Sequence, residues 1–377
     1  PRPASQRAAA LVLTAAMLIT LAAPAFADTW CIENGNITVK AGDTKGTNKV
    51  SQGSIIDKVD TNTIITNKNT DIASSNTVTI EANGKNDKVE VTLKDVNIDT
   101  SSRNNAAVSV TGSGNTTIKL DGDNHLTGGI SDNGSYGLSG ISSSGSLTIS
   151  GGETDSLTAQ GGSGGDGIYG GDGITSSGSL TISGGTVTAT GGNSTGSDGS
   201  GGDGISSTST TISGGTVTAD GGSGNFSGGN GIRSFDVAIS GGTVNVAGGN
   251  GGNGSRSDVG NGIISNGIDL SGSLELTAKA GSPNGKALSQ AGHELDLNTI
   301  KDKLGPGAKV TTTDADGKVN QVPIPGPVEP EEPVIPEESS SSSDGGSATP
   351  SAPASSLPGL TVTDKDGQRI SYTSTQS

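Results

Sequence analysis

Five times between Gly140 and Ala278 the chain repeats, with drift, the stretch Gly173-Ile-Thr-Ser-Ser-Gly-Ser-Leu-Thr-Ile-Ser-Gly-Gly-Thr-Val-Thr-Ala189. A period near thirty residues is typical of repeat architectures. Each copy holds three short segments of alternating apolar and polar residues, separated by turn residues, which predicts three strands per coil of a β-solenoid. The copies begin at Ile141, Ile174, Ile205, Ile232 and Ile263, with spacings of 33, 31, 27 and 31 residues.

The apolar positions recur in columns from copy to copy. In the quoted copy, Ile174, Leu180, Ile182, Val187 and Ala189 should point inward, while Thr186 and Thr188 should point to solvent. Weaker copies extend the pattern toward the N-terminus. These copies contribute Val78, Ile80, Val89, Val91, Leu93, Val96 and Ile98, and then Val108, Val110, Ile118, Leu120 and Leu126.

The predicted fold is all-β: a single right-handed parallel β-helix with three strands per coil of about 30 residues, followed by a disordered linker. The β-helix should span residues 28–322. An N-terminal cap is expected near Trp30 to Val50. A C-terminal cap is expected from a helical segment at Asn298–Gly305 and a hairpin around Asp316-Gly317.

The composition agrees with a thin solenoid. Sixty-four glycines, 29% hydrophobic residues and 2% aromatic residues are too poor for the core of an ordinary globular enzyme of this length. Low hydrophobicity together with net charge also favours disorder, but the persistent Ile and Val columns argue against a disordered chain.

Residues 1–27 have the features of a signal peptide. Arg2 and Arg7 precede an apolar run from Ala8 to Ala23, and Ala25-Phe26-Ala27 fits a cleavage site, so the mature chain should begin at Asp28. This predicts a secreted protein, located outside the cell or at the cell surface, with no membrane insertion. Cys31 is the only cysteine and therefore forms no internal disulfide.

Charge and the C-terminal sequence indicate how the solenoid would be displayed. The formal net charge is −16, and this acidity makes nucleic acid a poor partner. Residues 323–358 are rich in Pro, Glu and Ser, which predicts an extended, self-repelling linker. Residues 359–377 resemble the start of a further β-domain that is truncated at Ser377.

Positive signals for catalysis are lacking in the sequence. His125 and His293 stand alone, without a zinc-protease motif, a nucleophile elbow or a recognisable pair of carboxylates. Asp314-Ala-Asp316-Gly317 resembles the start of a calcium-binding EF-hand loop, but its twelfth position is Pro325, which supplies no carboxylate. A hairpin turn explains this segment more simply.

A polar column precedes each Gly-Ile pair and is formed by Ser139, Asp172, Asp203, Asn230 and Asn261. In a parallel stack these side chains would lie about 4.8 Å apart, and the repulsion between Asp172 and Asp203 would be relieved by a cation. Asp166, six residues before Asp172, could add a third carboxylate. Calcium bound by Asp166, Asp172 and Asp203 is therefore one prediction, and solvated turn residues are the alternative.

A family resemblance rests on Val91-Thr-Leu-Lys-Asp-Val-Asn-Ile-Asp99, on Ile118-Lys-Leu-Asp-Gly-Asp-Asn-His-Leu126 and on the repeated Ile-Ser-Gly-Gly-Thr-Val-Thr-Ala. These segments resemble secreted right-handed parallel β-helix proteins of Gram-positive anaerobes, described as carbohydrate-binding domain-containing. The likeness spans residues 76–297. It implies a pectate-lyase-like helix that binds plant or cell-wall polysaccharide, with calcium in some members and no established catalysis.

Several functions remain open at this point. We expect a non-catalytic carbohydrate-binding or adhesion module that recognises a polysaccharide through the solenoid surface. A calcium-dependent polysaccharide lyase would need a basic residue, for which Arg233 is the candidate in the regular stack. A passive stalk of a surface protein is a third possibility. Outward threonines such as Thr216 and Thr218 also suggest an ice-ordering array, although threonine is simply a favoured strand residue.

Overall fold

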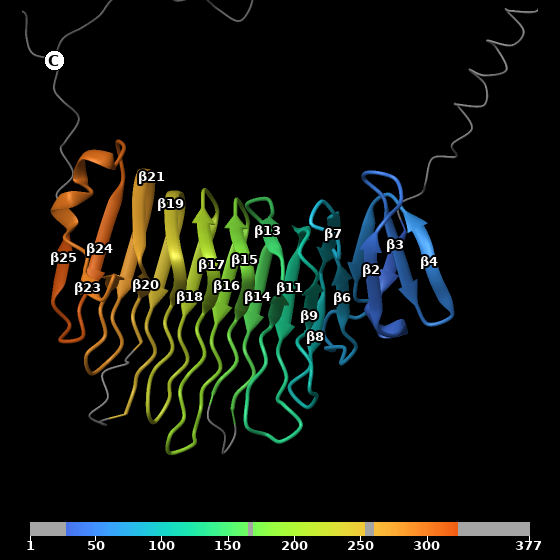
Figure 1. Cartoon of the computed structure of the whole chain (residues 1–377), viewed down its shortest axis with the longest axis horizontal. Coiled ribbons are helices and arrows are strands. Elements are labelled where there is room, and N and C mark those ends of the chain that lie inside the picture. Colours follow the sequence, from blue (N-terminus) through green and yellow to red (C-terminus); the bar gives the residue numbers. More distant parts are fainter. Residues whose placement is uncertain (1–27, 165–168, 253–259, 323–377) are drawn as a thin grey trace, which may run out of the picture. The chain divides into compact units, whose positions relative to one another are not determined.

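The computed structural model describes residues 28–164, 169–252 and 260–322. All of these residues belong to one compact unit, which is a β-solenoid of about eight turns. Figure 1 shows the coils side by side, with strands joined by loops that gather along one side. The predicted signal peptide, the predicted linker and the predicted C-terminal β-domain lie outside the described residues.

Each regular coil contributes one segment to each of three parallel stacks of strands, as the repeat predicts. The first stack contains β2 (Ile37–Ala41), β6 (Val78–Glu81), β9 (Val108–Thr111), β12 (Ile141–Ser143), the first parts of β15 (Ile174–Ile182), β17 (Ile205–Ile212) and β19 (Ile232–Ala247), then β20 (Ile263–Ser265) and β22 (Leu288–Gln290).

The second stack contains β1 (Thr29–Cys31), β5 (Thr63–Thr66), β7 (Lys88–Lys94), β10 (Asn115–Asp121), β13 (Ser146–Ser150), the later parts of β15 and β17, the middle of β19 and the start of β21 (Gly267–Lys279). The third stack contains β8 (Asn97–Asp99), β11 (Asp123–Thr127), β14 (Ser156–Gln160), β16 (Thr186–Thr190), β18 (Thr216–Asp220), the ends of β19 and β21, and β24 (Lys309–Thr313).

The stacks stay in register although the copies differ in length. In the first stack Ile174 pairs with Ile205, Ile205 with Ile232, and Ile232 with Ile263. The differences of a few residues are absorbed in the loops and in small irregularities, such as the one between Ile239 and Gly241. Register is set here by the buried face, because a slip of one residue would turn every apolar side chain outward.

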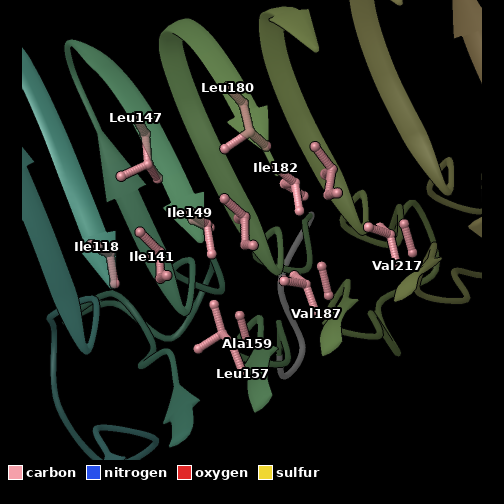
Figure 2. Packing of buried hydrophobic residues seen from close by; sticks show 14 of the residues in the cluster. Ile118, Ile141, Leu147, Ile149, Leu157, Ala159, Leu180, Ile182, Val187 and Val217 are labelled. Atoms are coloured by element: carbon pink, nitrogen blue, oxygen red, sulfur yellow. The ribbon is translucent and has the colours of Figure 1, made fainter. Parts of the chain in front are cut away.

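The core is the predicted set of apolar columns. Ile174, Leu180, Ile182, Val187 and Ala189 are all fully buried. Figure 2 shows side chains of this kind from successive coils lying between the strands, for example Ile149 beside Ile182. Val244 is buried while Thr243 is half-exposed, so the alternation holds even in the long strand β19. The all-β parallel solenoid expected from the repeat is confirmed.

The glycine-rich segments between coils form an ordered layer that the sequence did not predict. The N–H of Gly192 donates to the carbonyl of Gly171, that of Gly202 to Gly192, and that of Gly222 to Gly202, at 2.7 to 2.9 Å. A Cβ added at Gly192 would lie 2.0 Å from the carbonyl oxygen of Gly162. Glycine is needed in this layer because the backbones approach too closely for any side chain.

Antiparallel strands and short helices cap both ends. At the N-terminal end, η1 (Ile32–Asn34) follows β1, and β3 (Asn48–Gln52) pairs with both β2 and β4 (Ile55–Asp60). At the C-terminal end, β23 (His293–Glu294) pairs with β22, and β25 (Val319–Gln321) pairs with β24. The expected helical segment consists of two 3-10 turns, η2 (Leu297–Thr299) and η3 (Lys301–Lys303). Among the described residues, no helix is long and apolar enough to cross a membrane.

Candidate polysaccharide-binding groove

From Asp172 onward, the predicted polar column forms a hydrogen-bonded ladder just before the first stack, whereas the hydroxyl of Ser139 is hydrogen-bonded to that of Thr175 at 2.9 Å. Its members lie two residues before the buried aliphatic residue that opens each coil, so they stand in register. The Oδ1 atom of Asp172 accepts the backbone N–H of Asp203 at 2.7 Å, and Oδ1 of Asp203 accepts that of Asn230 at 2.6 Å. Asn230 then accepts from Asn261 at 2.9 Å, and Asn261 from Lys286 at 2.9 Å. Each side chain therefore supports the backbone of the next coil.

The remaining carboxylate oxygens also have partners within the protein. Thr175 donates its hydroxyl to Oδ2 of Asp172 at 2.8 Å. Arg233, on β19, places its Nε atom 2.8 Å from Oδ2 of Asp203. The side-chain amide of Asn230 donates a second bond to Oδ1 of Asp203 at 2.8 Å. All four oxygens of the two carboxylates are thus hydrogen-bonded or ion-paired.

Burial changes the protonation of this pair. Loss of hydration raises the pKa of Asp172 to about 6, and the nearby charge of Asp203 adds to the rise. Burial also raises the pKa of Asp203, against the opposing effects of Arg233 and of the bonds from Asn230. Asp203 is the more enclosed residue, at 6% exposed.

The predicted calcium site is only partly described. The structure brings Asp172 and Asp203 together as neighbours in the ladder, whereas Asp166 lies outside the described residues. Within the described part of the chain, no group of three His, Cys, Asp or Glu residues is placed to hold a metal ion. A cation at Asp172 and Asp203 would have to compete with Thr175 and Arg233 for their oxygens. Calcium stays a prediction, and support of the backbone is the role that the hydrogen bonds give to these carboxylates.

A hollow of about 900 Å³ lies beside the ladder on the first stack. It spans four successive coils and contains two cationic side chains, one exposed aromatic ring and many hydroxyl and amide groups. Its lining includes Arg233, Phe235, Asn266, Asn284 and Lys286. We call it the large hollow.

A second hollow of about 410 Å³, the small hollow, lies over earlier coils of the same stack and includes Ser109, Ser142 and Asp172 in its lining. The two hollows follow a single row of residues, each of which comes directly after the buried aliphatic residue of its coil. The row reads Ser109, Ser142, Thr175, Ser206, Arg233, Ile264 and Ser289. We call this row, with the hollows along it, the axial groove.

One exposed aromatic ring lines the large hollow, and two more belong to residues that are sequence neighbours of the small hollow's lining. Tyr136 and Tyr169 stack on each other with ring centroids 5.8 Å apart and planes 13° apart. They are 42% and 50% exposed, and each directly precedes a glycine that lines the small hollow. Phe235 in the large hollow is 60% exposed.

Sequence reasoning identified some of these residues and missed others. The polar column was recognised because it recurs in each copy of the repeat. Arg233 was recognised because it interrupts the repeat. Lys286 and Phe235 were not assigned to a site. Lys286 stands in the ladder position of a coil that lacks the repeat motif, and Phe235 replaces a small residue at an outward position. The sequence did contain a signal for Lys286. Gly285-Lys-Ala-Leu288 resembles Asn261-Gly-Ile263, which places the lysine at the ladder position.

The third stack carries the predicted outward threonines. Thr186 pairs with Thr216, and Thr188 with Thr218. Their side chains are half-exposed, as the alternation predicts. The row ends at Asn245, which is the partner of Thr218 on β19.

These features define a class of protein, a parallel β-solenoid with a polar groove along one stack of strands. In comparisons with protein families, with curated proteins and with solved structures, nothing matches this chain. A ligand for the groove can therefore be proposed only from the groove's own residues.

Proposed function

We propose that this protein is a secreted, non-catalytic carbohydrate-binding module that holds a polysaccharide in the axial groove. The observation that carries the proposal is the single row that joins the two hollows. Polar groups recur along it at every coil except that of Ile264, with a spacing of about 4.8 Å between neighbouring strands. A surface with such a regular repeat of hydrogen-bonding groups suits a repeating polymer.

The aromatic residues support a sugar ligand. Sugar rings present apolar C–H faces, and aromatic rings provide flat apolar surfaces for contact with them. Tyr136 and Tyr169 are exposed and directly precede residues that line the small hollow, and Phe235 is exposed in the large hollow. With only three such rings, affinity per site should be modest, and tight retention would depend on many contacts along the polymer.

The ladder supports binding rather than catalysis. A lyase would need a group that removes a proton from the sugar. Arginine is a poor proton acceptor, and Arg233 is ion-paired with Asp203. Both carboxylates already accept protein hydrogen bonds. The role proposed for these residues is to fix the shape of the groove.

The test is retention of the full chain on insoluble glucans and pectin, with calcium or with a chelator, alongside an assay for unsaturated sugar products. We expect retention without product release. Replacing Tyr136 and Tyr169 together by Ala should weaken retention severalfold. Ile56→Ala is the matched control, because Ile56 on β4 is an exposed apolar residue away from the groove. No retention on any polymer would favour a passive stalk, and release of unsaturated products would favour the lyase.

A further inference from the structure

The large hollow gathers positive charge in a protein whose formal net charge is −16. Two of its lining side chains, Arg233 and Lys286, are cationic. They come from different coils that are two strands apart along the first stack, because the strand of Arg233 pairs with β20 and β20 pairs with β22. Two strand spacings amount to about 10 Å.

Arg233 is fixed in a way that leaves its outer end available. Its Nε atom pairs with the buried carboxylate of Asp203 at 2.8 Å, and Asp203 is itself held by two bonds from Asn230. The Arg233 side chain is nevertheless 61% exposed. Among the described residues, its two terminal nitrogens have no hydrogen-bond partner. A guanidinium held through Nε keeps its terminal N–H groups for an external acceptor.

Lys286 has a similar arrangement. Its backbone N–H is held by Asn261 at 2.9 Å, while its ammonium group forms no ion pair with the described residues. Burial raises the pKa of the nearby Glu294, and the charge of Lys286 opposes part of this rise. Glu294 also accepts the N–H of Leu288 at 3.0 Å. The buried carboxylate of Asp203 is ion-paired with Nε of Arg233. Among the described residues that line the hollow there is no Asp or Glu, so the charged groups that face it are Arg233 and Lys286.

We propose that the large hollow binds the anionic groups of an acidic glycan, carboxylates or sulfate esters, directly through Arg233 and Lys286 and without a bridging metal ion. The proposal rests on the proposed function and names its ligand class. Arginine forms two parallel hydrogen bonds with a planar oxyanion, and lysine adds a compact positive charge. Phe235 would contact the sugar ring, and the side-chain amides of Asn266 and Asn284 would bind its hydroxyl groups.

The experiment compares two ligands that differ only in charge. Fragments of polygalacturonate and the same fragments after methyl esterification are titrated into the full chain by calorimetry in low salt with a chelator present. We expect the acid form to bind at least about tenfold more tightly than the ester, since it gains charge-assisted hydrogen bonds. The difference should shrink as salt is raised, because the hollow is open to solvent. Dextran sulfate compared with dextran distinguishes sulfate from carboxylate as the preferred anion.

Two variants locate the effect. Lys286→Gln should reduce the preference for the acid form severalfold. Arg233→Gln alone would leave the buried carboxylate of Asp203 without its cation and destabilise the fold. Arg233→Gln is therefore combined with Asp203→Asn, which gives this ladder position the same uncharged side chain that Asn230 has in the next coil. The control is Lys119→Gln on β10, which removes the same charge from an exposed ion pair with Glu90 on another stack.

The outcomes separate this inference from the function on which it rests. If acid and ester bind equally, or if Lys119→Gln reduces the preference as much as Lys286→Gln, direct recognition of anions is wrong while glycan binding stands. If neither form of any glycan binds, the proposed function itself fails. If the acid form binds only after calcium is restored, a metal bridge replaces the direct contacts.

Discussion

At the scale of single residues, the ladder before the first stack combines two roles that are usually separate. Asp172 supports the backbone of the next coil and also lines the small hollow. Asn230 performs the same backbone role one coil beyond Asp203 without carrying a charge. An amide therefore suffices for the structure, and the carboxylate at Asp172 adds a charge that burial disfavours.

This difference predicts how stability depends on pH. Because the pKa of Asp172 is raised from 3.8 to about 6 in the folded protein, the folded state keeps its proton at pH values where the unfolded chain has lost it. Stability should therefore fall as pH rises from about 4 to about 6, and the full loss should persist above pH 6.

Asp172→Asn should reduce this fall and raise the free energy of unfolding at pH 7, relative to pH 4, by on the order of 1–3 kcal/mol. A smaller fall should remain, because burial also raises the pKa of Asp203. Urea denaturation at a series of pH values measures it. Asp302→Asn, on the exposed turn η3, is the control and should leave the profile unchanged. An Asp172→Asn profile that falls as much as the wild-type profile between pH 4 and 6 would contradict the assignment.

Thr116 gives a second prediction at this scale. It lies in the apolar column of β10, with Val89 and Leu147 as neighbours in register. Its hydroxyl is buried without a hydrogen-bond partner in the described part of the chain. Thr116→Val keeps the shape and removes the unsatisfied group, so it should stabilise the protein by about 1 kcal/mol. Thr117→Val, at the next outward position, should change the stability little, and equal effects of the two substitutions would refute the explanation.

At the scale of elements, alternation predicted the strands well but not where they end. The repeat suggested three separate strands in each coil, whereas β19 runs without a break from Ile232 to Ala247. The Gly241-Gly242 corner inside it stays hydrogen-bonded to its neighbours because the coils on both sides turn at the same place. Propensity alone assigns a glycine pair to a turn, and only stacking reveals the continuous ladder.

The glycine layer was missed for a related reason. Glycine-rich segments carry no side-chain pattern, so an ordered layer and a flexible loop look alike in sequence. In the structure the positions are sterically demanding. Gly192→Ala would place its Cβ against the backbone of Gly162 and should destabilise the protein by about 1–3 kcal/mol.

The control for this substitution is Ser223→Ala, at an exposed position of the next such segment, which should have little effect. Urea midpoints of both variants measure the difference. If Gly192→Ala unfolds at the same urea concentration as Ser223→Ala, the layer is not a rigid part of the fold.

At the scale of the whole molecule, the sequence predicted the solenoid and the polar column. It did not predict the axial groove, which reaches β22, next to the C-terminal cap. Lys286 reaches the large hollow from a coil outside the recognisable repeat, and Phe235 interrupts a polar position. Such residues become a site only when coils of different sequence are stacked in register. A hollow spanning several coils has no local sequence signature, because each coil supplies only a few of its residues.

The length of the axial groove leads to a final prediction. From Ser142 in the small hollow to Arg233 in the large one there are three strand spacings, about 14 Å. A disaccharide is too short to occupy both hollows, whereas a hexasaccharide of the same glycan can reach from the tyrosine pair to Arg233. Joining two weak contacts in one ligand makes the second contact intramolecular, so the hexasaccharide should bind at least about tenfold more tightly.

Calorimetric titration of a size series checks this, and the variant in which Tyr136 and Tyr169 are both replaced by Ala shows where the gain arises. That variant should bind the disaccharide nearly as well as the wild-type chain if the disaccharide prefers the large hollow, but it should lose most of the gain with length. Ile56→Ala should retain the whole gain. Equal affinities for disaccharide and hexasaccharide would mean that the two hollows bind separately, and the axial groove would then be two independent sites rather than one track for a polymer.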